Sequence, residues 1–193
     1  SHLAALAAGV DDRPVEVDRA VKSIGHEETY PTDLTERSDL ERELVRLSDA
    51  VAARLRRQAT AARTLTLKVR FAGFRTVTRS VTLASAVDTT EELVAALRPL
   101  LRALDVTEGV RLLGVSTSNF SAPSQQLSLL DGGSDGDDGP GRTADAIDEI
   151  RDRFGSTAIG PASSIGDRGL RLVERGAQQW GPDRPEPPKP KGR

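Results

Sequence analysis

Apolar residues recur at helical spacing in the first third of the chain, and this is its clearest pattern. The stripe consists of Leu40, Leu44, Leu47, Val51 and Leu55. Steps of three and four residues place these side chains on one face of an amphipathic helix, which we expect to run to about residue 60. The opposite, polar face would then carry Arg42, Arg46 and Asp49.

The segment before this helix, residues 22–34, begins as a strand. Pro31 and the polar residues after it are breaking signals, so we expect the strand to stop there. Asp33 and Glu36 have the three-residue spacing of a capping box. This pair predicts that the helix starts immediately after the turn.

Two strands joined by a tight turn are predicted next. Leu65, Leu67, Val69 and Phe71 alternate with polar residues, which is typical of a half-buried strand. Ala72 and Gly73 form the turn, and residues 74–83 return as a second strand. Its register is ambiguous because Arg75 and Arg79 share a parity with Val77, Val81 and Leu83, so a bulge or an exposed edge is expected. The other parity is a row of hydroxyls: Thr76, Thr78, Ser80 and Thr82.

A second helix is predicted from Asp88, with a possible capping box at Thr89 and Glu92. Its apolar stripe is Leu93, Leu97, Leu100 and Leu104. Residues 109–120 form the last strand. The order β-α-β-β-α-β predicts an α+β domain, a four-stranded sheet with two helices on one face.

The flanking segments have weaker patterns. Residues 3–9 are typical of a helix end closed by Gly9. Residues 131–141 are rich in Gly and Asp and predict a flexible linker. Near 144–155 a short helix would place Ile147, Ile150 and Phe154 on one face, where it either docks on a partner or frays. The remainder of residues 132–193 is expected to be a largely flexible tail.

Composition narrows the classes of function. The 193 residues include four Phe, one Tyr and one Trp, which disfavours a surface built on aromatic stacking. With no Cys, disulfides and thiolate metal sites are excluded, and a cytoplasmic location is expected. No apolar run approaches the roughly 18 residues of a membrane span, so no membrane partner is expected. The chain does not begin with Met, and we expect a fragment of a longer protein.

Charge is unevenly distributed along the chain. Residues 50–87 contain no Asp or Glu, whereas their basic side chains are Arg54, Arg56, Arg57, Arg63, Lys68, Arg70, Arg75 and Arg79. A stretch with one sign of charge indicates a polyanionic partner. The alternative is an ordinary charged surface.

Catalytic arrangements are missing from the sequence. His26 is followed by Glu27 and Glu28, but neighbours on a strand point to opposite faces, and His2 lies at the chain end. There is no Cys nucleophile, no P-loop and no dinucleotide fingerprint. We therefore expect that this chain is not itself an enzyme.

Three separated motifs resemble one known family. They are KSIGHEETY at 22–30, FRTVTRSVTL at 74–83 and VRLLGVSTSNF at 110–120. They resemble the little finger of Y-family DNA polymerases, most closely the DNA polymerase IV (DinB) type. Residues 9–15 are similar to the end of the thumb. The resemblance implies that residues 1–21 are the thumb end and linker, and that residues 22–122 are the little finger.

The resemblance also implies where activity lies. The catalytic palm and the fingers are absent, so a DNA-directed polymerase activity for translesion synthesis would belong to a parent protein. Mg²⁺ is expected in that parent, and no cofactor is expected in this fragment. Two alternatives remain: the same region of a polymerase-like accessory protein with an inactive palm, and a stand-alone nucleic-acid-binding module. Against an RNA-binding module, the chain lacks the aromatic pairs of an RRM and the GXXG loop of a KH domain.

A set of DNA-contacting residues follows from the resemblance. In the family the sheet lies on primer-template DNA and holds phosphates through main-chain amides, hydroxyls and basic side chains. By position this implies Lys22, Ser23, Thr78, Arg79, Ser80 and Arg111. The charge pattern itself adds Lys68, Arg70 and Arg75. For Arg111 the alternative is a surface salt bridge with Glu108.

Residues 123–131 contain a second motif, QQLSLLD. It resembles the peptide with which such polymerases dock on the DNA polymerase III sliding clamp (beta subunit). The matching residues are Gln126, Leu127, Ser128, Leu129 and Leu130. The alternative is a short apolar tail that packs back on the domain. The expected partners are thus primer-template DNA and the clamp, and the fragment is expected to be a monomer.

Overall fold

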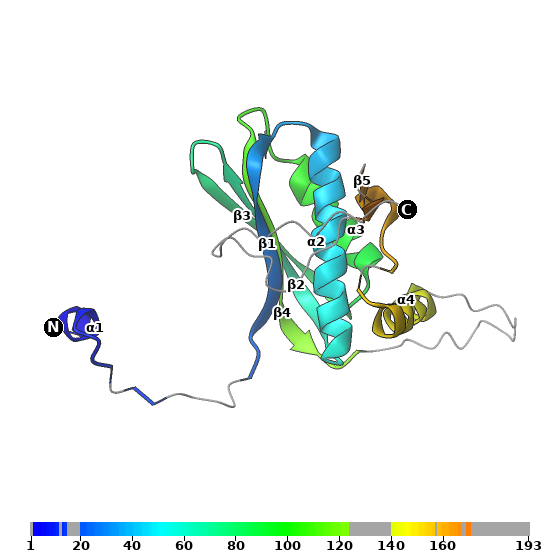
Figure 1. Cartoon of the computed structure of the whole chain (residues 1–193), viewed down its shortest axis with the longest axis horizontal. Coiled ribbons are helices and arrows are strands. Elements are labelled where there is room, and N and C mark those ends of the chain that lie inside the picture. Colours follow the sequence, from blue (N-terminus) through cyan, green and yellow to red (C-terminus); the bar gives the residue numbers. More distant parts are fainter. Residues whose placement is uncertain are drawn as a thin grey trace, which may run out of the picture.

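The computed structural model describes residues 2–11, 13–14, 20–123, 140–156, 158–166 and 169–170. Four antiparallel strands form its central sheet in the order β1-β4-β2-β3. The strands are β1 (Ser23–Leu34), β2 (Ala61–Phe71), β3 (Thr76–Val87) and β4 (Val110–Ser121). Helices α2 (Arg37–Arg57) and α3 (Thr90–Arg102) cover one face of the sheet (Figure 1). The predicted α+β fold and its element order are confirmed.

The core lies between the two helices and the sheet, as the apolar patterns predict. All five stripe residues of α2 are fully buried. Leu65, Leu67, Val69 and Phe71 of β2 face them and are at most 1% exposed. The predicted cap of α3 is also present, because Thr89 Oγ1 accepts from the Glu92 amide while the Thr89 amide donates to the Glu92 carboxylate.

The prediction that β1 stops at Pro31 is wrong. The strand continues to Leu34, with a register shift between Thr29 and Leu34. Since β1 is an edge strand, a residue without an amide hydrogen is tolerated there. The capping box is wrong as well: Glu36 is the N-cap of α2 without a side-chain cap, and Asp33 binds Arg111 instead.

The polar face of α2 predicted from the sequence is partly buried. Arg42 is exposed, but Arg46 and Asp49 are only 3% and 8% exposed. Arg46 is held by Glu43 on the same helix and by Glu28 on β1. Burial alone would lower the pKa of Arg46, but these two carboxylates outweigh it and raise the pKa. Arg46 and Asp49 are buried beside charged partners distant in sequence, Glu28 and Arg151 respectively, which helical periodicity does not include.

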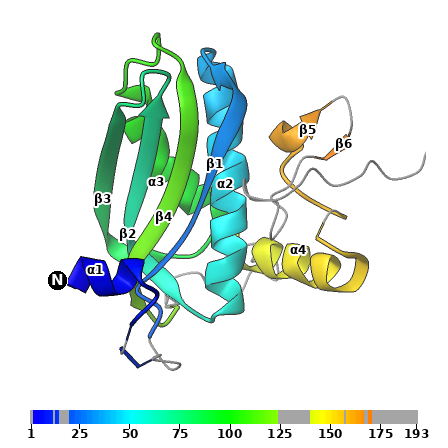
Figure 2. The same ribbon diagram turned by 60° about the vertical axis from the view of Figure 1, so that its left-hand side comes forward.

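Smaller elements flank this domain. Helix α1 (His2–Ala7) buries none of its residues, and Gly9 after it has φ +75°, as expected for a helix end. Helix α4 (Pro140–Phe154) confirms the helix predicted near 144–155 and lies beside α2, on the side away from the sheet (Figure 2). A short 3₁₀ turn η1 (Ala162–Ser164) and the small strands β5 (Ile165–Gly166) and β6 (Gly169–Leu170) follow. Within the described ranges, no helix has both the length and the apolar character needed to cross a membrane.

Candidate nucleic-acid interface

One face of the sheet is left open by the large helices. Helices α2, α3 and α4 all lie on the other side of the sheet (Figures 1 and 2). Because successive side chains on a strand point to opposite faces, the residues between the buried positions of β2 face outward. The open face is therefore defined by β2 residues 64, 66, 68 and 70 and by the residues paired with them.

Strand register aligns the side chains of the open face in four rows, because directly opposed residues share a face. From β1 across β4 and β2 to β3, the rows are Ser23, Ser118, Thr64 and Thr82; Gly25, Ser116, Thr66 and Ser80; Glu27, Gly114, Lys68 and Thr78; and Thr29, Leu112, Arg70 and Thr76. Most of these side chains carry a hydroxyl group. Hydroxyls donate to phosphate oxygens and carry no sequence information when they do so.

Hydrogen bonds within the rows hold several hydroxyls in place. The Thr64 and Thr82 hydroxyls are 3.0 Å apart, and those of Thr66 and Ser80 are 2.8 Å apart. Arg70 Nε donates to Thr76 Oγ1 at 3.1 Å. The described residues give Arg70 no ion pair within 4.0 Å, so its charge remains available to an anion.

Lys68 is the second cation of the open face, and it already has an anionic partner. Its Nζ lies 2.7 Å from Glu27 Oε2. Gly114 is paired with both residues and lies between them on β4. The acidic partner reduces the positive potential at the centre of the face.

Two further predicted cations lie at the end of the sheet formed by the β2–β3 turn. Arg75 contacts Glu108 at 2.9 Å and stacks over the Phe71 ring. Arg111 makes two hydrogen bonds to Asp33, at 3.0 and 3.1 Å. The alternative pairing of Arg111 with Glu108 is therefore wrong.

Arg111 and Asp33 each favour the charged form of the other. The hydrogen bond from Arg111 holds the pKa of Asp33 below its usual range, and Asp33 raises the pKa of Arg111. The guanidinium of Arg111 also lies 4.6 Å from the centre of the ring of Phe74, a side chain that is 66% exposed. Arg111 is thus fixed in position at this end of the sheet.

Among the predicted DNA-contacting residues of β3, Arg79 lies on the opposite face of the sheet from Thr78 and Ser80. It pairs with Leu67, a residue of the core, so its side chain leaves β3 on the helix side. The β2–β3 pairing is regular from Thr76 to Thr82, and β3 is an edge strand of the sheet, as β1 is. Thr78 and Ser80 lie on the open face and are exposed, and Lys22 and Ser23 are exposed where β1 begins.

The acid-free stretch of residues 50–87 does not form one surface. Arg54 donates to the Gly25 carbonyl and Arg56 to Asp148, both on the helix side. Of the basic residues in this stretch, only Lys68 and Arg70 lie in the rows of the open face. Charge read along the sequence therefore overstates the positive charge of this face.

Sequence reasoning missed Ser116, Ser118 and Glu27. The two serines alternate with buried Val115 and Thr117, a pattern that identifies them as outward-facing. The sequence gives no such sign that Glu27 pairs with Lys68. That contact depends on the order of the strands, which places β4 next to β1 and β2 next to β4.

The predicted clamp motif and linker are not part of the open face. The clamp-motif residues 126–130 and most of the predicted linker lie outside the described residues. In the part of the chain that the structure describes, no three His, Cys, Asp or Glu side chains are grouped so that they could hold a metal ion.

Comparison with known proteins agrees with the sequence resemblance. The model of the impB/mucB/samB family C-terminal domain matches residues 21–129. The chain is 39% identical over 166 residues to a DNA polymerase IV of Desulfatibacillum aliphaticivorans, covering 84% of this chain and 42% of the relative. It is 40% identical over 124 residues to a DNA polymerase IV of Streptomyces coelicolor, covering 64% of this chain and 26% of that protein.

Among solved structures, a similar chain occurs in a complex of a beta-clamp processivity factor with the little finger domain of PolIV. The identity is 22%, the TM-score is 0.44, and the match covers 57% of this chain and 98% of that one. The chain spans less than half of the length of the two sequence relatives above. The match of the family model to more than half of the chain shows that this protein belongs to the impB/mucB/samB family, whose C-terminal domain it contains at residues 21–129.

Proposed function

We propose that this chain is the DNA-binding and clamp-tethering region of a translesion DNA polymerase, with its open face on the primer-template duplex. The observation that supports this is the face itself, where hydroxyl rows surround Lys68 and Arg70 with no helix of the domain over them. Such a surface suits phosphates rather than base edges. Binding without base reading fits an enzyme that must accept damaged templates.

Polymerase activity and its Mg²⁺ belong, in this proposal, to parts of the polymerase that the matched domain does not include. In this proposal the chain binds the primer-template duplex and positions it for the polymerase. It does so as a monomer in the cytoplasm. Because the contacts are to phosphates, binding is weak, salt-sensitive and nearly independent of sequence.

Fluorescence anisotropy with a labelled primer-template at several salt concentrations tests the DNA contact. If roughly four phosphates are neutralised, log K against log salt has a slope of about −3.5. A slope near zero would contradict the proposal. Tighter binding to single-stranded RNA than to the duplex would favour a stand-alone RNA-binding module instead.

The clamp contact is the second part of the proposal, and the sequence at 126–130 supports it. Leu127, Leu129 and Leu130 would enter an apolar groove, each contributing on the order of 1.5–3 kcal/mol, and Gln126 would add about 1 kcal/mol by hydrogen bonding. Ordering the peptide offsets part of this sum, so an affinity near 1 μM, about −8 kcal/mol, is expected.

Calorimetric titration of the clamp tests this contact. Replacement of Gln126, Leu127 and Leu129 by Ala should abolish clamp binding and leave DNA binding and folding unchanged. Equal affinities of the wild-type and triple-Ala chains would place the contact on another surface.

A further inference from the structure

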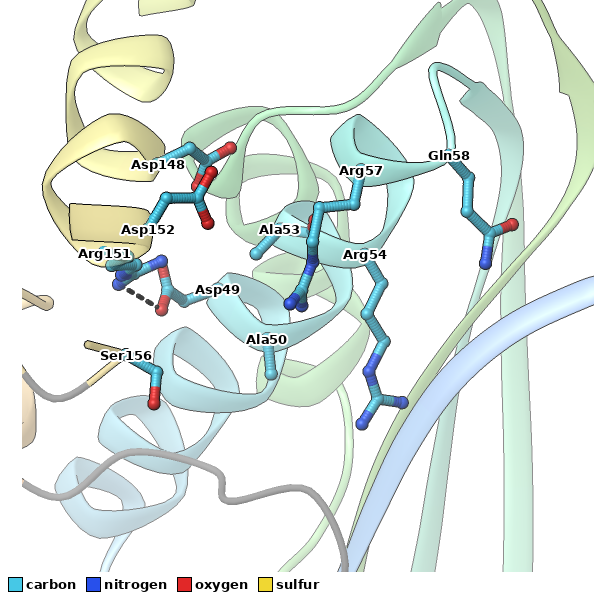
Figure 3. Close-up of a pocket in the computed structure, with 10 residues that line it drawn as sticks. All are labelled: Asp49, Ala50, Ala53, Arg54, Arg57, Gln58, Asp148, Arg151, Asp152 and Ser156. Atoms are coloured by element: carbon cyan, nitrogen blue, oxygen red, sulfur yellow. Dashed lines mark hydrogen bonds and ion pairs between the residues drawn. The ribbon is translucent and has the colours of Figure 1, made fainter. Parts of the chain in front are cut away.

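Helix α4 is attached to the domain by charged side chains. Asp148 accepts two hydrogen bonds from Arg56 of α2, at 2.6 and 2.9 Å. Arg151, one turn further along α4, donates to Asp49 of α2 at 2.8 Å (Figure 3). It also donates to the Ile159 carbonyl at 3.0 Å. The two pairs have opposite polarity, because α4 supplies the acid in one and the base in the other, so they fix the orientation of α4 where it crosses α2 (Figure 2).

These pairs are largely removed from water. The side chains of Arg151 and Asp49 are each 11% exposed, and those of Arg56 and Asp148 are 11% and 25% exposed. Burial would lower the pKa of Arg56, but the Asp148 carboxylate outweighs it and raises the pKa. Burial of both partners costs desolvation free energy, which offsets much of the attraction between them.

Few apolar side chains are buried where α4 meets α2. Ala144 is the one described residue of α4 that is buried, whereas Ile147 and Ile150 are half-buried and Phe154 is 67% exposed. A cavity of about 710 Å³ remains between α2 and α4; charged and polar side chains line most of it, together with Ala50 and Ala53 (Figure 3). By contrast, the stripe of α2 that faces the sheet is fully buried.

Like charges also oppose the docking of α4. Asp145 and Asp148 lie near enough to Asp88, which precedes α3, to act on its charge, although Arg56 acts in the opposite direction. Burial first, and then these neighbouring carboxylates, raise the pKa of Asp88. The net free energy that holds α4 in place is therefore small compared with that of the domain core.

We infer that α4 and η1 form a latch: this chain's own segment docks on the outer face of α2 through the Arg56–Asp148 and Arg151–Asp49 pairs, and it opens without unfolding the domain. The η1 turn packs on the same helix through buried Ser164 and gives the latch a second contact. The closed latch holds α4 on the side of the domain away from the open sheet face. An opened α4 is an isolated 15-residue helix, which is marginally stable in water.

The latch has one consequence that rests on the proposed function. The chain leaves the domain at residue 123 and returns to it at residue 140. The proposed clamp motif is therefore tied to the domain at both ends while the latch is closed, and at one end when it is open. The latch sets the reach of the clamp-binding peptide.

Hydrogen exchange of the whole chain, measured without DNA or clamp, tests the latch independently of the proposed function. Asp148→Asn removes the charge that binds Arg56 while retaining the shape of the side chain. We expect the protection of α4 amides to fall on the order of tenfold, the factor that corresponds to a loss of about 1.4 kcal/mol. Raising NaCl from about 0.1 M to about 1 M should lower the protection of the wild-type helix less than this substitution does, because partly buried pairs are screened much less than exposed ones.

Asp152→Asn is the matched control. Asp152 lies one turn from Asp148 on α4 and is exposed, and the structure gives it no ion pair among the described residues. Protection of α4 should be unchanged in this variant, and the amides of α3 should be unchanged in both. Equal behaviour of the two variants, or loss of α3 protection together with α4, would each overturn the inference.

Discussion

Lys68 and Glu27 form an ion pair over Gly114, across three strands of the open face. Their charged atoms are 2.7 Å apart, and Gly114 on β4 is paired with both residues. A glycine at this position leaves no side chain between the lysine and the glutamate. The pair therefore lies at the centre of the surface that we propose binds DNA.

Glu27→Gln should tighten DNA binding by up to about fivefold, because an exposed ion pair is worth at most about 1 kcal/mol and Lys68 would then be available to a phosphate. Anisotropy titrations of primer-template DNA measure the change. Glu91→Gln is the control, because Glu91 is an exposed acid on the helix side. The same gain in both variants would show that only net charge matters.

Gly114→Ala should destabilise the domain by about 1–3 kcal/mol, since the added carbon would lie 2.8 Å from Cβ of Glu27, closer than packed atoms tolerate. Urea unfolding measures the loss. In Gly73→Ala the new carbon meets only the flexible carboxylate end of Glu108, and a change below about 1 kcal/mol is expected. If the two variants lose the same stability, close contact at Gly114 is not the cause.

Arg70→Ala should weaken DNA binding for all sequences and reduce the salt slope by about 1, as expected for the loss of one phosphate contact. Arg79→Ala should have a smaller effect on both, because Arg79 leaves the sheet on the helix side. Anisotropy at several salt concentrations compares the two. A larger loss for Arg79 would mean that DNA wraps around the β3 edge rather than lying on the open face.

Stability should decrease as the pH falls through about 6.5, the ordinary pKa of histidine. Burial, followed by the nearby charges of Arg54 and Arg46, lowers the pKa of His26, while Glu28 and Glu27 act in the opposite direction. The unfolded chain then binds a proton at a higher pH than the folded chain, so acid favours unfolding. Each pKa unit of difference contributes about 1.4 kcal/mol.

Unfolding free energies at pH 5 and pH 7.5 check this pH dependence. His26→Gln should reduce the difference between the two values. The control is His2→Gln, in a helix that buries none of its residues. An unchanged pH dependence in His26→Gln would show that other groups cause it.

Local patterns in the sequence were sufficient for most of the fold. The helical stripe from Leu40 to Leu55, the alternation from Leu65 to Phe71 and the Thr89–Glu92 cap each depend on residues close together in the chain. The order of these elements, together with the motifs at 22–30, 74–83 and 110–120, also indicated the family. Most of the hydroxyl face could be read from the same alternation.

Contacts between distant residues were decided only by the tertiary structure. Pro31 remains in a strand because β1 is at the edge of the sheet, and Arg46 is buried because β1 brings Glu28 to α2. The partners of Lys68, Arg111 and Arg56 are 41, 78 and 92 residues away in the chain. Such pairs depend on strand order, register and helix docking, which set the three-dimensional position of each charge and leave no periodic trace in the sequence.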